Sequence, residues 1–243
     1  MQQVQYEAQY KYELEYFWYR VRGELLHDIL TTHLGGRTNL QLADIGCGTG
    51  ALTKELERYG NCVGIDPSPQ AVEFCKSRGV RDVRIGGAEA TGCASDTFDV
   101  VTCLDVLEHI PDDTLGIAEM HRILKPGGIA IIFVPTFMFL WGVMDELGNH
   151  HRRYLLSELA AKFAPEQFTV VRTSYFNTFL FPLVAMMRIC VRFFGIKLKT
   201  EIVPGDSFTN RLFYRIFSSE LHFLRHMNFP FGVSGLIVVR KNK

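Results

Sequence analysis

The sequence contains no closely spaced pair of cysteines. Six cysteines are scattered along 243 residues, and no two of them form a C-x-x-C pair. Several lie in apolar runs, where a free cysteine behaves as a small hydrophobic residue. We therefore expect neither a disulfide framework nor a zinc-thiolate site. The first residues also lack the basic and apolar regions of a signal peptide, so we expect a cytoplasmic protein.

An apolar run long enough to cross a membrane is also missing. The most apolar segment, 178–195, contains Pro182, and its charge-free stretch is shorter than the roughly 20 residues that a transmembrane helix needs. The net charge is zero, but residues 175–243 hold 10 Lys and Arg against 3 Asp and Glu. This basic final third fits an anionic partner, such as a phosphorylated substrate or a lipid surface.

The dinucleotide fingerprint G-x-G-x-x-G does not occur at the first glycine-rich turn. That turn reads Gly46-Cys-Gly-Thr-Gly50, and it follows a predicted strand at 40–45 and precedes a predicted helix at 51–59. Glycines at alternate positions suit a turn where the backbone comes close to a ligand and a Cβ would interfere. A strand, a glycine turn and a helix N-terminus in this order predict a site for a nucleotide-like ligand. The glycine spacing disfavours a nicotinamide-dependent enzyme.

Strand and helix patterns alternate through the first two thirds of the chain. Strands are predicted at 40–45, 62–65, 82–85, 98–104, 129–134, 168–173 and 235–240, and helices at 51–59, 67–76, 112–124 and 155–163. This rhythm predicts an α/β fold with a doubly wound, mostly parallel seven-stranded sheet whose last strand is antiparallel. We expect a single domain with four parts, which are an N-terminal helical lid (1–36), a Rossmann-like core (37–174), a helical cap insertion (175–232) and the last strand (233–243).

The N-terminal segment is predicted as one helix over residues 6–34, because apolar residues recur there every three to four positions. The segment holds more aromatic residues than a single buried face of a helix needs. One interpretation is a helix packed on the domain surface. The other is a lid that closes over a ligand, with Trp18 and Arg22 pointing inward.

Asp66 ends the second predicted strand, 20 residues after Gly46. From this position a carboxylate reaches the ribose hydroxyls in doubly wound nucleotide sites. An alternative role is to cap the following helix. The two roles are compatible.

Four ordered motifs resemble those of the class I S-adenosylmethionine-dependent methyltransferases. They are Asp44-Ile-Gly-Cys-Gly-Thr-Gly50, Gly64-Ile-Asp-Pro-Ser68, Phe98-Asp-Val-Val-Thr-Cys-Leu-Asp-Val-Leu-Glu-His-Ile110 and Leu124-Lys-Pro-Gly-Gly128. The resemblance implies S-adenosylmethionine as the cofactor and direct displacement of its methyl group onto a small or amphiphilic acceptor, at oxygen or nitrogen rather than carbon. The run from Trp141 to Tyr154 also resembles a bacterial subgroup whose substrates are largely unassigned.

The resemblance also implies which residues hold the cofactor. The glycine turn would lie under the methionine part, Arg22 would pair with its carboxylate, Asp66 would hold the ribose and Leu104 would lie against the cofactor. Many members have an acidic residue at the position of Gly87, so the adenine would rest on its neighbours here. The full set is Arg22, Asp44, Gly46, Cys47, Gly48, Asp66, Pro67, Ala88, Glu89 and Leu104.

His150 and Asp145 are the candidates for a catalytic base, because the loop after the fifth strand lies at the carboxyl edge of the sheet. Asp145 could equally form a structural ion-pair network with Arg152 and Arg153. His109 is expected to pack behind the cofactor pocket. The histidines show no metal-ligand spacing, so no metal site is predicted.

The insertion 175–232 leaves two interpretations open. It has the apolar face that a substrate cap needs, and segment 178–195 has the composition of an amphipathic helix in peripheral contact with the inner face of a membrane. Either fits a small-molecule or lipid-linked acceptor. The alternatives are methylation of RNA or protein, or a non-catalytic cofactor-binding scaffold. An Asn/Asp-Pro-Pro-Tyr signature and an appended nucleic-acid module are absent, and no DNA partner is expected.

Overall fold

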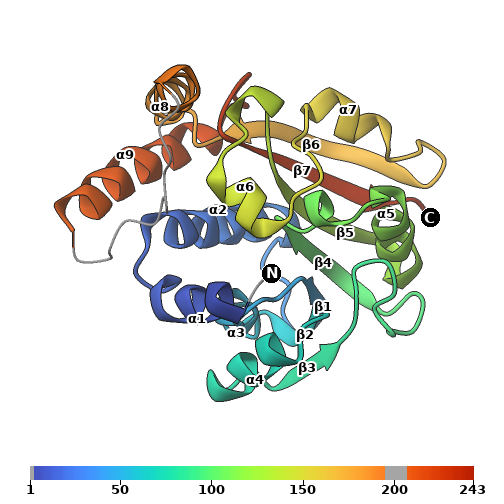
Figure 1. Ribbon diagram of the computed structural model, residues 1–243. Coiled ribbons are helices and arrows are strands. Elements are labelled where there is room, and N and C mark those ends of the chain that lie inside the picture. Colours follow the sequence, from blue (N-terminus) through green and yellow to red (C-terminus); the bar gives the residue numbers. More distant parts are fainter. Residues whose placement is uncertain (1–2, 195–206) are drawn as a thin grey trace.

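The computed structural model describes residues 3–194 and 207–243, and a seven-stranded sheet runs through its centre (Figure 1). The strands lie in the order β3-β2-β1-β4-β5-β7-β6. Strands β1 to β5 pair in parallel, and β7 is antiparallel to both of its neighbours. The predicted sheet is therefore confirmed. The strands are β1 Leu40–Ile45, β2 Gly60–Asp66, β3 Asp82–Ile85, β4 Phe98–Leu104, β5 Leu124–Pro135, β6 Phe168–Phe176 and β7 Ser234–Lys241.

Helices cover both faces of the sheet (Figure 1). They are α1 Gln3–Tyr12, α2 Phe17–Leu34, α3 Ala51–Leu56, α4 Pro69–Ser77, α5 Asp113–Ile123, α6 Val143–Gly148, α7 Leu156–Ala161, α8 Phe181–Phe194 and α9 Phe208–Leu224, with short 3-10 turns η1 Leu107–His109 and η2 Met138–Leu140. The Ser68 side chain caps α4, and Pro69 occupies its first turn. The helix therefore begins two residues later than the sequence predicted.

The prediction of one helix over residues 6–34 is wrong, because the chain breaks between α1 and α2. At the break, Glu13 turns inward to an ion pair of 2.6 Å with Arg78 and accepts a hydrogen bond from the Thr49 hydroxyl. Tyr16 precedes α2 in an extended conformation. These long-range contacts outweigh the local helical periodicity. As a result α1 lies over the glycine turn, whereas α2 packs against the sheet.

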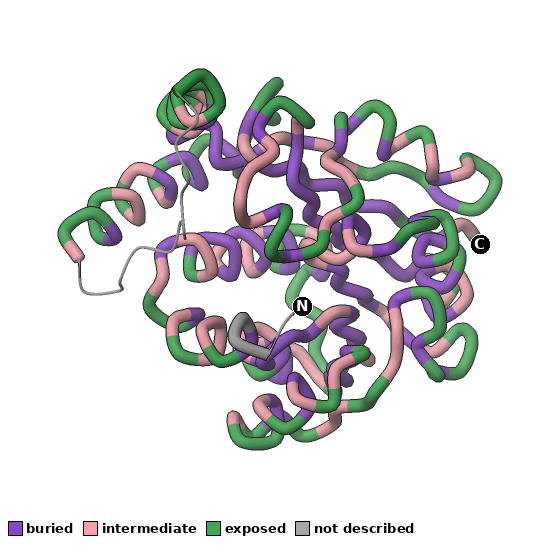
Figure 2. The backbone as a smooth tube through the Cα atoms, in the orientation of Figure 1, coloured by how far each residue is buried: buried purple, intermediate pink, exposed green. Residues whose placement is uncertain are grey.

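The connection between β6 and β7 carries α8 and α9. Helix α9 packs against α2, and it buries Phe217, Leu221 and Leu224 in the core beneath it. Helix α8 lies at the periphery and is coloured mostly as exposed in Figure 2. Among the described residues, no helix has both the length and the apolarity to span a bilayer.

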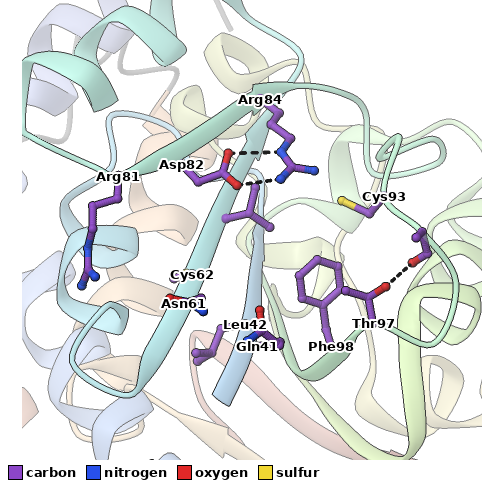
Figure 3. Close-up of a pocket in the computed structure, with 12 residues that line it drawn as sticks. Gln41, Leu42, Asn61, Cys62, Arg81, Asp82, Arg84, Cys93, Thr97 and Phe98 are labelled. Carbon is purple, nitrogen blue, oxygen red and sulfur yellow. Dashed lines mark hydrogen bonds and ion pairs between the residues drawn. The ribbon is translucent and has the colours of Figure 1, made fainter. Parts of the chain in front are cut away.

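A hollow of about 410 Å³ lies beside the amino-terminal halves of β1, β2 and β3 (Figure 3). Gln41, Asn61 and Asp82 line it at the start of their strands. Its arginines are paired, since Arg84 binds Asp82 at 2.6 Å and Arg81 binds Glu57 at 2.9 Å. Ligands of doubly wound sheets bind at the opposite, carboxyl edge of the strands. The hollow is therefore not the expected ligand site.

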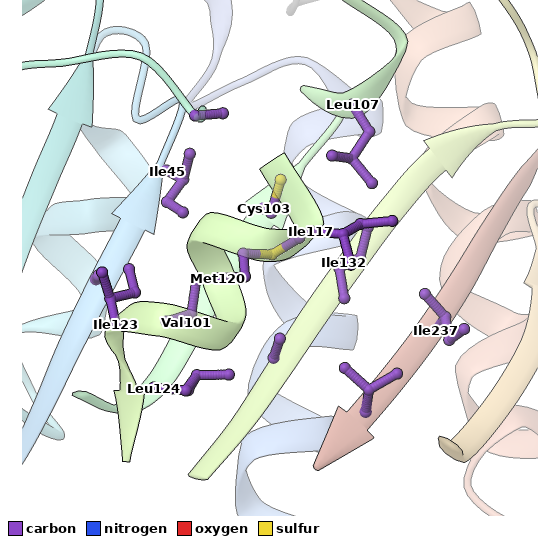
Figure 4. Packing of buried hydrophobic residues seen from close by; sticks show 14 of the residues in the cluster. Ile45, Val101, Cys103, Leu107, Ile117, Met120, Ile123, Leu124, Ile132 and Ile237 are labelled. Carbon is purple, nitrogen blue, oxygen red and sulfur yellow. The ribbon is translucent and has the colours of Figure 1, made fainter. Parts of the chain in front are cut away.

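The core has two layers because alternate residues of each strand face opposite sides of the sheet. In β4, Val101 belongs to the layer under α5 and α7, whereas Val100 belongs to the layer under α2 and α9. Ile132 and Ile131 of β5 divide in the same way. Figure 4 shows α5 packed on the first layer. These continuous apolar strands, buried on both faces, hold the carboxyl edge of the sheet in a fixed position.

Candidate active site

The glycine turn after β1 lies where the strand order reverses. Strand β2 extends the sheet on one side of β1 and β4 on the other, and doubly wound folds bind ligands at such a switch point. Gly46 and Gly48 have φ of 71° and 54°, a left-handed conformation that favours glycine. A Cβ on Gly46 would lie 2.3 Å from Cγ2 of Val106, which follows β4. The turn thus needs glycine for its conformation and its packing.

Asp66 ends β2 beside this turn, as the sequence predicted. Its carboxylate accepts hydrogen bonds from the backbone amides of Gly48 at 3.0 Å and Ser68 at 2.9 Å, and from the Tyr6 hydroxyl at 3.2 Å. Burial raises the pKa of Asp66. The carboxylate orders the start of α4, although Ser68 is the N-cap residue. Pro67, exposed beside it, and the ribose contact of Asp66 remain predictions.

Helix α1 lies directly over the turn. Tyr6 reaches Asp66 from this helix, and a Cβ on Gly48 would lie 2.8 Å from Nε2 of Gln9. Helix α2 instead buries Val21 and Leu25 against the sheet. Trp18 and Arg22, which the lid interpretation pointed inward, lie on α2, and closure of the segment over a ligand stays a prediction. The first half covers the site and the second belongs to the core.

Arg22 extends from α2 to the carboxyl end of β4. It forms an ion pair of 2.7 Å with Asp105, and its guanidinium lies 5.8 Å from the ring centroid of Phe133. The Nε atom is buried and has no hydrogen-bond partner in the part of the chain that the structure describes. A free buried donor at the switch point suits an anionic group. The contact of Arg22 with a methionine carboxylate remains a prediction.

Asp44 lies below the turn and is enclosed by hydroxyl groups. Thr53 donates to its carboxylate at 2.6 Å and Thr102 at 2.7 Å. Burial raises its pKa. Cys47, within the turn, is buried with its Sγ 3.8 Å from that of Cys75. Asp44 thus supports the turn from beneath, and a direct contact of either residue with a cofactor stays a prediction.

The segment predicted to contact the adenine of the cofactor is a tight turn after β3. The Ala90 amide donates to the Gly87 carbonyl at 3.2 Å, which leaves Ala88 buried and Glu89 exposed. A Cβ on Gly87 would lie 3.1 Å from Oε2 of Glu89, so the Glu89 carboxylate folds back over Gly87. Leu104 lies half-buried at the end of β4. These residues border the same edge of the sheet, and their cofactor contacts stay predictions.

Asp145 is buried at the start of α6 and has two cationic or potentially cationic neighbours. It pairs with His150 Nδ1 at 3.0 Å and with Arg153 at 2.8 and 2.9 Å. Burial alone would raise the pKa of Asp145, but the bonds from His150 and Arg153 outweigh it and lower that pKa to about 2. The predicted pair of Asp145 with His150 and the predicted ion pair of Asp145 with Arg153 are therefore both present and share the Asp145 carboxylate. Arg152, which the sequence grouped with this network, pairs instead with Asp113 at 3.1 Å.

His150 lies against the segment that follows β4. The His151 amide donates to the Glu108 carbonyl at 2.8 Å, and the rings of His150 and His109 meet edge to face with centroids 4.6 Å apart. Glu108 is fully buried, and both of its carboxyl oxygens lack a partner among the described residues. Burial and the nearby Asp105 raise the pKa of Glu108 well above its ordinary value.

Three residues of this site were not singled out from the sequence as site residues. They are Tyr6, Asp105 and Glu108. Asp105 and Glu108 stand one and four residues after a predicted buried strand, at the edge where ligands bind, and that position was the available signal. Tyr6 offered no such signal, since its contact depends on the break between α1 and α2.

Comparisons with known proteins agree with this geometry. Residues 43–132 match a family model described as a methyltransferase domain. The ubiquinone biosynthesis O-methyltransferase of Azorhizobium caulinodans is 37% identical over 125 residues, which cover 46% of this chain and 49% of that protein. Its counterpart in Methylococcus capsulatus is 38% identical over 139 residues, covering 54% and 52%. The chain thus spans about half the length of these curated relatives.

Solved structures extend the likeness of fold to most of the chain. A crystal structure described as a putative sarcosine dimethylglycine methyltransferase from Galdieria sulphuraria has a TM-score of 0.60 and 16% identity, covering 91% of this chain and 85% of that one. The N-methyltransferase NodS from Bradyrhizobium japonicum, in complex with S-adenosyl-L-homocysteine, has a TM-score of 0.55 and 16% identity, covering 92% and 87%.

The sheet order and the glycine turn at its switch point define a Rossmann-like ligand-binding fold. Together with the family model matched over residues 43–132, they show that this part of the chain is similar to a methyltransferase domain.

Proposed function

We propose that this protein transfers the methyl group of S-adenosylmethionine to a small or amphiphilic acceptor. The observation that carries the proposal is the buried Asp66 carboxylate, held over the glycine turn by the amides of Gly48 and Ser68. This is the position from which a carboxylate binds a ribose diol. The curated relatives are ubiquinone biosynthesis O-methyltransferases, which supports a hydroxyl group as the acceptor.

The residues present fit the cofactor. Gly46 and Gly48 place no side chain of their own at the switch point, and the buried Nε of Arg22 can donate to a carboxylate. Arg22 would hold the methionine end and Asp66 the ribose, with Leu104 lining the pocket between them. When bound, S-adenosylmethionine supplies an electrophilic methyl group on a sulfonium.

On the acceptor side we assign His150 as the base and Asp145 as the residue that orients it. Because Nδ1 of His150 pairs with Asp145, Nε2 is the atom left to receive a proton. The acceptor hydroxyl would give its proton to Nε2 while an oxygen lone pair forms the new bond to the methyl carbon. The carbon–sulfur bond of the bound cofactor would break in the same step, which would leave S-adenosylhomocysteine. Most of the rate would come from alignment of the acceptor with the methyl group.

The described parts of the insertion, 175–194 and 207–232, would form a cap for the acceptor, and α8 would bring the protein to a membrane that holds a lipid-linked acceptor. Helix α8 contains no acidic residue and carries two arginines, of which Arg192 is exposed and Arg188 is buried. Ile189, Phe193 and Phe194 on it are 61%, 82% and 70% exposed. Large exposed apolar side chains beside basic residues are typical of helices that lie in the plane of an anionic membrane. We therefore propose peripheral contact at the inner face of a membrane.

Calorimetry with S-adenosylmethionine and S-adenosylhomocysteine tests the proposal. We expect wild-type protein to bind both, and Asp66→Ala to bind about 10- to 100-fold more weakly, since hydrogen bonds to a charged group contribute about 1.5–3 kcal/mol each. Glu73→Gln, an exposed position on α4, is the matched control. The proposal fails if wild type binds neither ligand or if folded Asp66→Ala binds them unchanged. An assay with labelled methyl donor and phenolic or polyprenyl acceptors then identifies the acceptor class.

A further inference from the structure

Three side chains with metal-binding atoms meet at the carboxyl edge of the sheet. Glu108 and His109 belong to η1 after β4, and His150 follows α6. One ligand atom from each lies within 4.8 Å of the others. The His151-to-Glu108 backbone hydrogen bond holds the two segments together. These residues are far apart in sequence, so their spacing gave no sign of a shared site.

The Glu108 carboxyl group is the second observation that points to a ligand. It is 0% exposed, and neither oxygen has a hydrogen-bond partner among the described residues. A buried carboxyl group without a partner costs free energy, and such groups in native proteins are usually paired or bind an ion. The nearest arginines are already engaged, since Arg22 pairs with Asp105 and Arg153 with Asp145. A cation bound to Glu108 would remove this cost.

The two imidazole rings are oriented as metal ligands usually are. Nδ1 of His150 pairs with the Asp145 carboxylate at 3.0 Å, and the His109 ring hydrogen-bonds to the backbone of Gly148. Each ring thus has one nitrogen fixed by an outer partner, and the other nitrogen remains for a ligand. Outer partners of this kind set the tautomer and direction of metal-ligating histidines. Both histidines are partly exposed, which leaves an open side to the cluster.

We propose that Glu108, His109 and His150 bind one divalent transition-metal ion, with Zn²⁺, Mn²⁺ and Fe²⁺ as the class of ligand. Two imidazoles and one carboxylate form a set that these ions accept, with open positions for water or a substrate oxygen. The three ligand atoms lie within 4.8 Å of one another, which brings them close to the spacing that bonds of about 2.0–2.2 Å to one ion require. Mg²⁺, which prefers oxygen ligands, is disfavoured.

Metal binding itself does not depend on the proposed methyl transfer, but its consequence for catalysis does. In the metal-bound protein Nε2 of His150 would be a ligand and no longer a base. An acceptor hydroxyl bound at an open position would then lose its proton more readily because it binds a cation. The metal would thus take over the role that His150 has in the metal-free protein.

The test is calorimetric titration of chelator-treated full-length protein with Zn²⁺, Mn²⁺ and Mg²⁺, without cofactor. We expect one Zn²⁺ per chain with a Kd in the micromolar range or below, and at least 100-fold weaker binding in Glu108→Gln and in His109→Ala. His151→Ala, an exposed histidine next to His150, should bind as wild type does. Co²⁺ substitution gives a second readout, because its visible absorption reports nitrogen ligation and should disappear in His109→Ala.

No Zn²⁺ binding by wild type, or unchanged Zn²⁺ binding in folded Glu108→Gln, would overturn the proposal. Binding of S-adenosylmethionine to the same samples separates the two proposals. Protein that binds the cofactor but no metal refutes only the metal site, and protein that binds metal but no cofactor refutes only the proposed function.

Discussion

Nδ1 of His150 lies 3.0 Å from Oδ1 of Asp145, and Arg153 donates hydrogen bonds to both oxygens of the same carboxylate. Asp145 and Arg153 side chains are 1% and 8% exposed, so this ion pair is buried. The pair fixes the carboxylate, and the carboxylate fixes the imidazole. His150 is therefore presented in one tautomer and one direction, as both a base and a metal ligand require.

Asp145→Asn should lower the rate of methyl transfer by at least about 10-fold, because an amide can donate to the imidazole and so favour the wrong tautomer. Binding of S-adenosylmethionine, measured by calorimetry, should be unchanged, since Asp145 is not among the residues assigned to the cofactor. The buried Arg153 would lose its charged partner, and we expect unfolding by denaturant to show a loss of about 3 kcal/mol.

Glu146→Gln is the matched control, because Glu146 is the next residue on α6 and is exposed. It should leave both rate and stability near wild type. A purely structural role for Asp145 predicts that Asp145→Asn, assayed at a temperature where it is fully folded, turns over at the wild-type rate.

Glu220 makes stability depend on pH in the neutral range. It is fully buried in α9, and its carboxyl group accepts hydrogen bonds from the backbone amides of Asn177, Thr178 and Phe179. Burial raises the pKa of Glu220 from 4.5 to about 7 despite these amides. The folded state therefore holds a proton more tightly than the unfolded state. This contribution is fully present below about pH 4.5 and is lost as the pH rises to about 7.

Glu220→Gln should remove that dependence. Wild-type unfolding free energy should fall by about 3 kcal/mol from this group between pH 4.5 and 7, at 1.36 kcal/mol for each pKa unit, and Glu220→Gln should lack this part of the slope. Denaturant unfolding at several pH values measures the slope. The exposed Glu158→Gln is the control. Parallel slopes in wild type and Glu220→Gln would contradict the assignment.

Local sequence signals predicted the central fold because they act within single elements. The bounds of β1, β3 and β4 agree with the structure to the residue, since each is a compact apolar run between turn signals. The glycine turn and Asp66 were found for the same reason, because the edge of a strand fixes where the next residues lie.

Features that depend on contacts between distant segments were missed or left open. Glu13 ends α1 through its pair with Arg78, and no local pattern announces that contact. Asp145 and His150 were named as candidates, but the orphaned Glu108 beside them becomes visible only when η1 and the α6 loop meet. Arg188 and Arg192 stand four residues apart in α8, yet Arg188 is buried and Arg192 is exposed. Helical spacing alone does not predict this difference, because burial depends on the neighbouring elements.

The exposed end of α8 gives the sharpest test of membrane contact. Phe193 and Phe194 together present two rings that are 82% and 70% exposed, so replacing them should change the surface and not the core. The double variant Phe193→Ser, Phe194→Ser should bind anionic vesicles at least about 10-fold more weakly, because each buried CH₂ contributes about 0.8 kcal/mol to membrane binding. Its unfolding midpoint should remain that of wild type.

Flotation with vesicles that contain phosphatidylglycerol, at low and high salt, measures the effect. Leu115→Ser on α5, at a position 53% exposed and outside the insertion, controls for the loss of any exposed apolar side chain. Vesicle binding that weakens with added salt or with neutral lipid would show the electrostatic contribution of α8, whose exposed charged side chain is Arg192. Wild-type protein that stays in solution with anionic vesicles at low salt would rule out the membrane contact. If the double variant then methylates a soluble acceptor more slowly than wild type does, the result favours a substrate cap. The two rings would in that case contact the acceptor and not a membrane.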